Sequence, residues 1–402
     1  VGFMNDSTLT KALMYLENTG IPNNKTEDYK YCNMDGIFKK EFKNVEQKFV
    51  EINDIEKYKL EDTITLVVVN GTFSEALSDK TILKGLHLTK LSNLEQAGKK
   101  LIASLANVES DAFIAMNTAF CSDGFHLKIA RNETLQIPIH ILYISSSESE
   151  AMVNTRNIIE LEENSEASII EQQVVIGTGK VFTNYVSEKF VAQNAKLNSY
   201  LFQNEGTLGF SVNTNQVKLD SDGHYDNTTI TLSGQLVRNN HNVVIAGQNA
   251  EAHLNGLFSS KGTQLVDNHT LMDHQVPHCE SSELYKGIIN DKSTGVFNGK
   301  IFVRKDAQKT NAYQSSKNIL LSDDATINTK PQLEIYADDV KCSHGTSTGK
   351  IDESAMFYLN ARGIGKDSAR KLLLSSFAQE VINKIEVDSL REKITTLFEN
   401  EI

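Results

Sequence analysis

The middle of the chain alternates apolar and polar residues in short runs, and polar turn-like segments separate these runs. The alternation is clear in Asn194-Ala-Lys-Leu-Asn-Ser-Tyr-Leu-Phe202 and in Asn249-Ala-Glu-Ala-His-Leu-Asn-Gly-Leu-Phe258. A period of two residues is typical of β-strands that bury one face. Long helical patterns do not occur between about 135 and 340. We therefore expect this region to be built from strands.

The turn-like segments recur at nearly constant spacing. Measured from Asn164, the intervals to Asn194, Asp222 and Asn249 are 30, 28 and 27 residues, and a further 74 residues, enough for two more units, lead to Asp323. This repeat predicts a parallel β-helix, whose corner Asn and Asp side chains can hydrogen-bond along the stack. An antiparallel sandwich also alternates strands with polar turns. The constant spacing and the scarcity of Asn-Gly or Asp-Gly hairpin turns favour the β-helix.

The residues before this region have a mainly helical pattern. Ser7 and Thr8 can cap a helix whose apolar residues recur at helical spacing until Gly20 ends it. The same spacing predicts a second helix over 88–105. Between them, the apolar run at 63–71 predicts a buried strand that ends in an Asn-Gly turn.

After residue 350 the pattern is helical again. Asp352 is a natural N-cap for a helix that Gly363 would end, and two more helices are expected over 367–385 and 389–399. Helices here could cap the last coil, which otherwise leaves unpaired backbone groups and an open apolar end.

The predicted fold is therefore mainly β. A right-handed parallel β-helix (β-solenoid) core at 131–345 lies between a mainly helical N-terminal region at 1–130 and a C-terminal helical region at 346–402.

Charge and cysteine content limit the class of partner. Forty basic and 52 acidic residues give a net charge of −12, which argues against binding nucleic acid or anionic membranes. No apolar run approaches the ~20 residues of a membrane helix, and the first residues lack the pattern of a secretory signal. The four cysteines are sparse and widely spaced, as in reduced proteins. We expect a cytoplasmic protein that binds neither nucleic acid nor membranes.

Known catalytic and nucleotide motifs do not occur. Gly345-Thr-Ser-Thr-Gly-Lys350 has three residues between its glycines where a phosphate loop has four, and Ile351 replaces the Ser or Thr that binds magnesium. There is no Ser nucleophile elbow, His-Glu-x-x-His helix or dinucleotide fingerprint. We expect a chain that does not hydrolyse ATP and is not itself an enzyme.

One group of candidate metal ligands contains His269, His274, His278 and Cys279. These residue types bind zinc or iron. His269 and His274 are five residues apart, however, so a regular strand would direct them to opposite faces. Pro277 also disrupts the pairing of a central strand. A solenoid corner or an inward-packed polar stack is favoured over a metal site.

A second group contains Cys342 and His344, which are two residues apart on an expected strand and should share a face. Asp338 and Asp339 are expected at a corner or bulge just before them. A thiolate beside an imidazole suits iron, zinc or part of an iron–sulfur cluster. Two ligands do not complete a metal site, so a partner or cluster would supply the rest. The alternative is structural, with a buried Cys342 and a turn-capping His344, and the pattern favours neither.

Several motifs resemble one known family. Tyr336-Ala-Asp-Asp-Val-Lys-Cys-Ser-His-Gly345 and Phe357-Tyr-Leu-Asn-Ala-Arg-Gly363 resemble a C-terminal signature of the SufB/SufD family of iron–sulfur cluster assembly proteins, in its SufD form. Lys25-Thr-Glu-Asp-Tyr-Lys-Tyr31 resembles the family's N-terminal run, where Trp usually stands in place of Tyr29. Segments at 117–124, 278–287 and 318–331 match as well.

The resemblance implies a parallel β-helix that acts as a scaffold. It implies a complex with a SufB-like paralogue and a SufC-like ABC ATPase, in which helices at 353–385 dock the ATPase and the final strands pair with the paralogue. His344 matches a histidine implicated in cluster assembly at the subunit interface, and Cys342 matches its neighbouring thiol. The complex would hold an iron–sulfur cluster transiently, and the isolated chain would bind none firmly. Without the paralogue the chain could form a homodimer.

A β-helical enzyme acting on polysaccharide is the alternative function, because several parallel β-helices cleave such polymers. It would need an exposed groove with basic residues and carboxylates, and aromatic platforms help to bind sugar. The chain has no Trp and no obvious catalytic set. These observations favour the scaffold.

Overall fold

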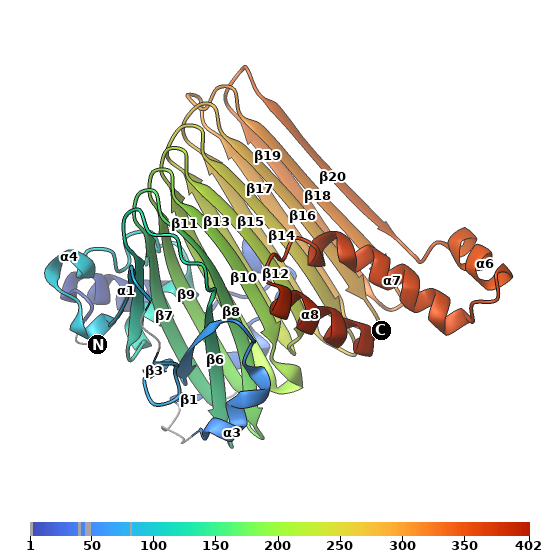
Figure 1. Cartoon of the computed structure of the whole chain (residues 1–402), viewed down its shortest axis with the longest axis horizontal. Helices are drawn as coiled ribbons and strands as arrows, with labels where there is room; N and C mark the ends of the chain where they lie inside the picture. The colour runs from blue at the N-terminus through green and yellow to red at the C-terminus, as the bar shows by residue number, and fades with distance from the viewer. Residues whose placement is uncertain (1–2, 39–41, 45–49, 81–82) are drawn as a thin grey trace.

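The computed structural model describes residues 3–38, 42–44, 50–80 and 83–402. In these residues two long sheets face each other, and from β5 onward successive strands alternate between them (Figure 1). Sheet A has the order β19 (Thr326–Ile335), β17 (Thr294–Val303), β15 (Leu265–His274), β13 (Leu236–Ile245), β11 (Gly209–Leu219), β9 (Val181–Val191), β7 (Ala151–Leu161), β5 (Gly124–Ile129) and β4 (Leu86–Lys90), with β1 (Lys43–Asn44) beside β7. Sheet B has the order β20 (Lys341–Gly349), β18 (Asn311–Leu320), β16 (Glu280–Ile289), β14 (Glu251–Ser260), β12 (His224–Ser233), β10 (Lys196–Asn204), β8 (Glu166–Gly177), β6 (Ile139–Ser147), β2 (Ile64–Val69) and β3 (Thr72–Ser74).

Neighbouring strands from β6 to β20 pair in parallel, and each coil lies in register on the one before it. Lys196 of β10, for example, lies opposite Glu166 of β8 and His224 of β12. The predicted solenoid is confirmed as a parallel β-solenoid of about 8 turns.

The corners where the chain passes from sheet A to sheet B contain the predicted repeat. Asn164, Asn194, Asp222 and Asn249 all have left-handed backbone conformations, with φ between 54° and 59°. Asn and Asp tolerate this conformation better than other residues with a side chain. The Asn194 amide donates to the Asn164 side chain over 2.9 Å, and the Asn249 amide donates to Asp222 over 3.2 Å. The predicted hydrogen bonds along the stack are confirmed.

Asp323 does not belong to this series, so that part of the prediction was wrong. It lies between β18 and β19, where the chain returns from sheet B to sheet A. The coils after Asn249 turn instead at His278 and Lys309, whose φ angles are 63° and 61°. Both corners of a coil need polar turn residues, so composition alone could not separate them.

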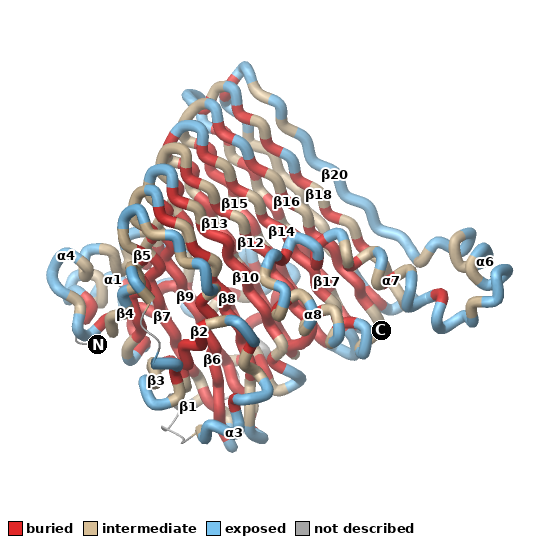
Figure 2. Tube along the Cα trace, viewed as in Figure 1, coloured by how far each residue is buried: buried red, intermediate tan, exposed pale blue. Residues whose placement is uncertain are grey.

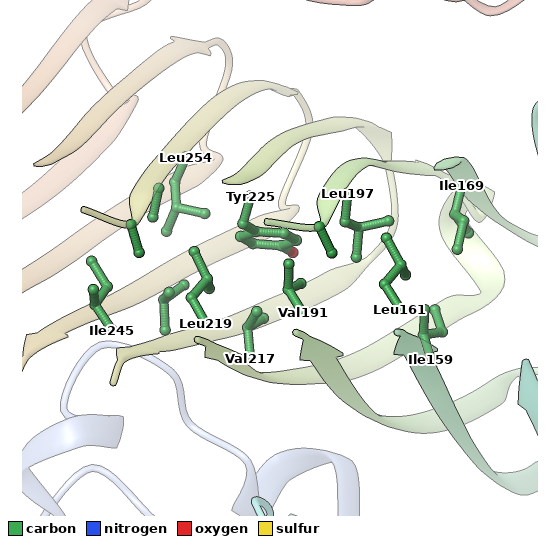
Figure 3. Packing of buried hydrophobic residues seen from close by; sticks show 14 of the residues in the cluster. Ile159, Leu161, Ile169, Val191, Leu197, Val217, Leu219, Tyr225, Ile245 and Leu254 are labelled. Atoms are coloured by element: carbon green, nitrogen blue, oxygen red, sulfur yellow. The ribbon is translucent and has the colours of Figure 1, made fainter. Parts of the chain in front are cut away.

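A large cluster of apolar side chains fills part of the space between the sheets. This buried cluster extends from the first coils to the last, and Figure 3 shows part of it. Its labelled members are Ile159, Leu161, Ile169, Val191, Leu197, Val217, Leu219, Tyr225, Ile245 and Leu254. The alternation therefore has its predicted cause at positions such as Leu197 and Leu254, which face this core. Phe202 and Leu257 face outward instead.

The N-terminal region covers the start of the solenoid with helices and also adds strands to it. Its helices are α1 (Asp6–Thr19), α2 (Asp35–Phe38), α3 (Ile52–Ile55), α4 (Gln96–Lys99) and α5 (Ala112–Phe120). The first predicted helix is confirmed as α1, although Asn5 rather than Ser7 caps it. The predicted strand is confirmed as β2, and its turn contains Asn70 and Gly71 at φ 48° and 80°.

The predicted helix at 88–105 was wrong. Residues 86–90 form β4, which pairs antiparallel with β5, and Leu88 lies opposite Leu127. Only α4 is helical in the remainder, apart from a 3-10 turn at 91–93. The apolar spacing was compatible with a helix, but the start of sheet A offered a strand partner.

The C-terminal helices are α6 (Glu353–Ala361), α7 (Lys366–Ile382) and α8 (Asp388–Glu401), close to their predicted bounds. The Asp352 side chain caps α6, as predicted. No helix of the described residues is long and apolar enough to cross a membrane.

The prediction that these helices cap the last coil was wrong. The helices α7 and α8 lie against the outer face of sheet B (Figure 1). Their Leu374 and Phe398 pack on side chains such as Phe202 and Leu257. That face is apolar in the middle coils, whereas the outward positions of β20 are Lys341, Ser343, Gly345, Ser347 and Gly349. Burying the apolar patch stabilises the helices more than covering a polar strand would. The last coil therefore remains uncovered.

Candidate functional site

The last strand of sheet B is exposed along its length (Figure 2). On one side β20 pairs with β18, and the Lys341 N–H donates to the Thr310 carbonyl over 2.8 Å. In a parallel ladder every second residue bonds to the same neighbour. The N–H groups of Cys342, His344 and Thr346 therefore point to the free edge. This edge is a template for another strand.

Cys342 and His344 share a face of β20, as predicted. They lie opposite Ala312 and Gln314, whose side chains are buried inside the solenoid. Cys342 is half-buried against the inner core, and this burial raises the pKa of its thiol. His344 is exposed in the middle of the strand, so its reading as a turn cap was wrong. Asp338 and Asp339 lie at the corner before β20, as expected.

The pair supplies two metal ligands, one sulfur and one nitrogen, at a place that another molecule can reach. In the described parts of the chain, no group of three or more His, Cys, Asp or Glu side chains is arranged to hold a metal ion. A structural metal site needs about four ligands. Cys342 and His344 therefore fit one half of a shared site, and their role as metal ligands stays a prediction.

Family models account for nearly the whole chain. Residues 143–377 match the model described as SUF system FeS cluster assembly, SufBD core domain, and residues 2–141 match the SufBD protein N-terminal region. The chain belongs to the SufB/SufD family. The predicted resemblance is confirmed, and this membership favours an assembly protein over a polysaccharide-active enzyme.

Individual family members are similar over most of their length. Iron–sulfur cluster assembly protein SufD of Escherichia coli is 30% identical over 95% of this chain and 89% of its own. A SufBD family protein of Synechocystis is 28% identical over 93% of this chain and 86% of its own. SufD of Bacillus subtilis is 23% identical over 82% and 76%.

The other histidine group does not converge on one point. His269 lies on the outer face of sheet A, where its Nε2 is 2.9 Å from Asp267. His274 points into the core, and its Nε2 is 2.9 Å from the Ser281 hydroxyl. The prediction that one strand directs these two rings to opposite faces is confirmed.

His278 and Cys279 complete that group at a corner. His278 is the left-handed corner residue between β15 and β16. Cys279 is buried in the core, with its sulfur 3.3 Å from the Gly247 carbonyl. The predicted corner and inward polar stack are therefore both present, which explains this family motif structurally.

The N-terminal family motif binds the solenoid through Tyr29. The guanidinium of Arg238 lies 3.9 Å from the centre of the Tyr29 ring and donates to Asp267 over 2.6 Å. The Tyr29 hydroxyl donates to Asp111, which also caps α5. An aromatic ring at this position thus stacks on a buried cation, and the Tyr29 hydroxyl adds a hydrogen bond. Sequence reasoning missed this network because its members are far apart in the chain.

A polar cavity of about 440 Å³ lies beside this network, between the N-terminal segment and the outer face of sheet A. Its two lysines are already paired. Lys300 is 2.7 Å from Glu334, and Lys330 is 2.8 Å from Glu27. The Lys330 contact fastens the N-terminal segment to the last coil of sheet A, and the Lys300 contact joins β17 to β19. They favour no particular ligand.

The helix α6 presents a second exposed surface of this family member. None of its residues is buried, and Phe357 and Tyr358 are 75% and 55% exposed. Leu372 of α7 is exposed as well. Large apolar side chains that are exposed together mark interaction sites.

Proposed function

We propose that this chain is a non-catalytic scaffold subunit of the SUF system, on whose open end an iron–sulfur cluster is built with a partner chain and then passed on. One observation carries the proposal. Cys342 and His344, a thiol and an imidazole, share a face of a strand whose free edge has no partner strand in the described chain. Membership of the SufB/SufD family supplies the system in which this pair would act.

The partner at this edge would be a SufB-like paralogue that adds a strand beside β20. Strand addition uses the free N–H and C=O groups for affinity and side chains for specificity. Tyr313, Ile335 and Tyr336 are exposed on the last strands and at the last corner, where they can act as apolar anchors. Without the paralogue, a second copy of this chain could use the same edge.

The free edge of sheet A is less suited to strand addition than that of sheet B, which favours β20 as the pairing strand. The Thr326 N–H donates to the Ser293 carbonyl, just before β17, so Pro331, five residues later, directs its ring nitrogen to the free edge of β19. Proline has no N–H to donate, and it blunts edge strands against pairing. Pairing through β19 would be interrupted there, whereas β20 contains no proline.

Iron and sulfide are the substrates at this joint. A thiol must lose its proton before it binds metal. The raised thiol pKa of Cys342 means that the isolated chain holds the thiol protonated, so firm binding would require the partner's ligands. This supports a transient cluster that exists only in the complex.

A SufC-like ABC ATPase would dock on α6 and the start of α7. The exposed Phe357, Tyr358 and Leu372 support this placement. Since the sequence lacks a phosphate loop, ATP hydrolysis would be the partner's task. The four cysteines are free thiols, which supports action in a reducing compartment such as the cytoplasm.

The direct test is iron and sulfide analysis of the complex purified without oxygen. His344→Ala should leave the complex intact and lower iron and sulfide content at least threefold. His224→Ala, at a half-exposed ring away from the open end, is the matched control and should have no effect. Normal iron and sulfide in His344→Ala would reject the proposed role of this edge.

A further inference from the structure

The interior of the solenoid is polar just behind its open end. Glu283 of β16, Gln314 of β18 and His344 of β20 lie opposite one another on three successive coils of sheet B. The side chains of Glu283 and Gln314 are both 3% exposed, and that of His344 is exposed. A row of polar groups thus runs from the uncovered edge two coils into the core.

Two oxygen atoms in this row have no hydrogen-bond donor. The Thr270 hydroxyl donates to Glu283 Oε2, and Gln314 Nε2 approaches the same atom at 3.4 Å. Glu283 Oε1 and Gln314 Oε1 have no partner among the described residues. Native proteins rarely bury acceptors in this way, and an ion is one explanation.

The charge of Glu283 is also unbalanced. Another inward carboxylate, Glu171, pairs with the buried ammonium of Lys189. No Lys, Arg or His side chain in the described residues forms an ion pair with Glu283. Its burial raises the pKa of the carboxyl to about 7, so the carboxyl is partly protonated at neutral pH and becomes ionised as the pH rises above that value. An ionised carboxylate inside a protein is stable only when it is paired or binds a metal.

We propose that Glu283 and Gln314 form an inner binding site for a divalent cation, which enters from the open end past His344. The site offers a carboxylate oxygen, an amide oxygen and the Thr270 hydroxyl, all of which are oxygen ligands. Such ligands suit Mg²⁺ and Mn²⁺ rather than the softer ions that thiolates select, and iron(II) also takes carboxylate ligands. The inference rests on the proposed function, in which this site would hold iron(II) behind the strand where the cluster forms.

The competing explanation is a proton. A protonated Glu283 carries no charge, so its burial would need no ion. The two explanations differ in whether the full chain binds a metal at this place.

The test uses Mn²⁺ alone, added to the metal-free full chain at pH 8, with free Mn²⁺ measured by electron paramagnetic resonance. We expect the wild type to bind one Mn²⁺ per chain. Glu283→Gln should bind Mn²⁺ with an affinity lower by about 10-fold or more, because one ligand charge is lost. Glu205→Gln is the matched control. Glu205 is equally buried, has a pKa raised to about 7 by burial and has two oxygens without partners, but it follows β10, far from the open end. Its variant should bind Mn²⁺ as the wild type does.

Two further variants keep the test decisive. If Glu283→Gln does not fold, Gln314→Met should weaken Mn²⁺ binding by removing the other oxygen. The double variant Cys342→Ser, His344→Ala should retain Mn²⁺, since the outer pair is not part of the inner site.

No Mn²⁺ binding by the wild type, or equal binding by Glu283→Gln, would overturn the inner site and favour the proton. Neither result bears on the proposed function, which is tested separately by the iron and sulfide content of the His344→Ala complex.

Discussion

Proline in place of Thr346 should separate the folding of the chain from its pairing with another subunit. The Thr346 N–H points to the free edge of β20, so proline removes no backbone hydrogen bond within the chain. Proline is tolerated on an edge strand and excluded from a central one. Pro331 shows that the last coil already accommodates proline on a free edge. In the proposed complex β20 would no longer be an edge.

The expected loss follows from one broken ladder bond. The facing carbonyl of the added strand would be buried without a donor, which costs about 1–3 kcal/mol. This corresponds to a dissociation constant about 5- to 150-fold higher. The clash of the proline ring with the added strand would increase the loss.

The assay is a binding titration of the chain with a SufB-like paralogue. Thr346→Ala is the control, because both variants lose the 3.4 Å contact between the Thr346 and Thr329 hydroxyls. Both variants should keep the circular dichroism spectrum of the wild type, and only Thr346→Pro should bind weakly. A folded Thr346→Pro chain that binds with wild-type affinity would refute strand addition at β20.

Three further predictions concern other parts of the chain. Burial raises the pKa of Glu205 from 4.5 to about 7, so the folded chain keeps a proton that the unfolded chain releases, and stability falls as pH rises between these values. Between pH 4.5 and 8 the free energy of unfolding of Glu205→Gln should therefore fall by about 3 kcal/mol less than that of the wild type. Unfolding midpoints of the variant that follow the wild-type pH profile would contradict this. Phe357→Asp should abolish co-purification with a SufC-like ATPase while pairing with the paralogue persists; retention of the ATPase would count against docking on α6. Tyr29→Phe should lower the free energy of unfolding by about 1.5–3 kcal/mol, since it loses a hydrogen bond to a carboxylate, whereas an unchanged thermal midpoint would show that this bond contributes nothing.

The repeated corners were predictable because each coil demands the same backbone conformation at the same place. Asn164, Asn194, Asp222 and Asn249 reveal the coil length through residue type alone. The shared face of Cys342 and His344 was predictable for a similar reason, since strand alternation is local.

Non-local partners explain the failures. Leu88 pairs with Leu127, and no pattern within 88–105 contains that information. The C-terminal helices were expected over the last coil because their apolar face is visible in the sequence, whereas the buried residues of the apolar patch that receives it come from five different strands. The row of Glu283, Gln314 and His344 was missed because its members are 31 and 30 residues apart in the chain. Only the pairing of successive coils brings them side by side.

Amide hydrogen exchange across 341–349 tests most directly whether the open end is the subunit joint. In the isolated chain the amides of Cys342, His344 and Thr346 should exchange rapidly, because their N–H groups lack partners. In complex with the paralogue the same amides should become protected, while the amides of Ser343 and Gly345, already bonded to β18, should change little. Unchanged exchange at Cys342, His344 and Thr346, with new protection on some other surface, would contradict the account.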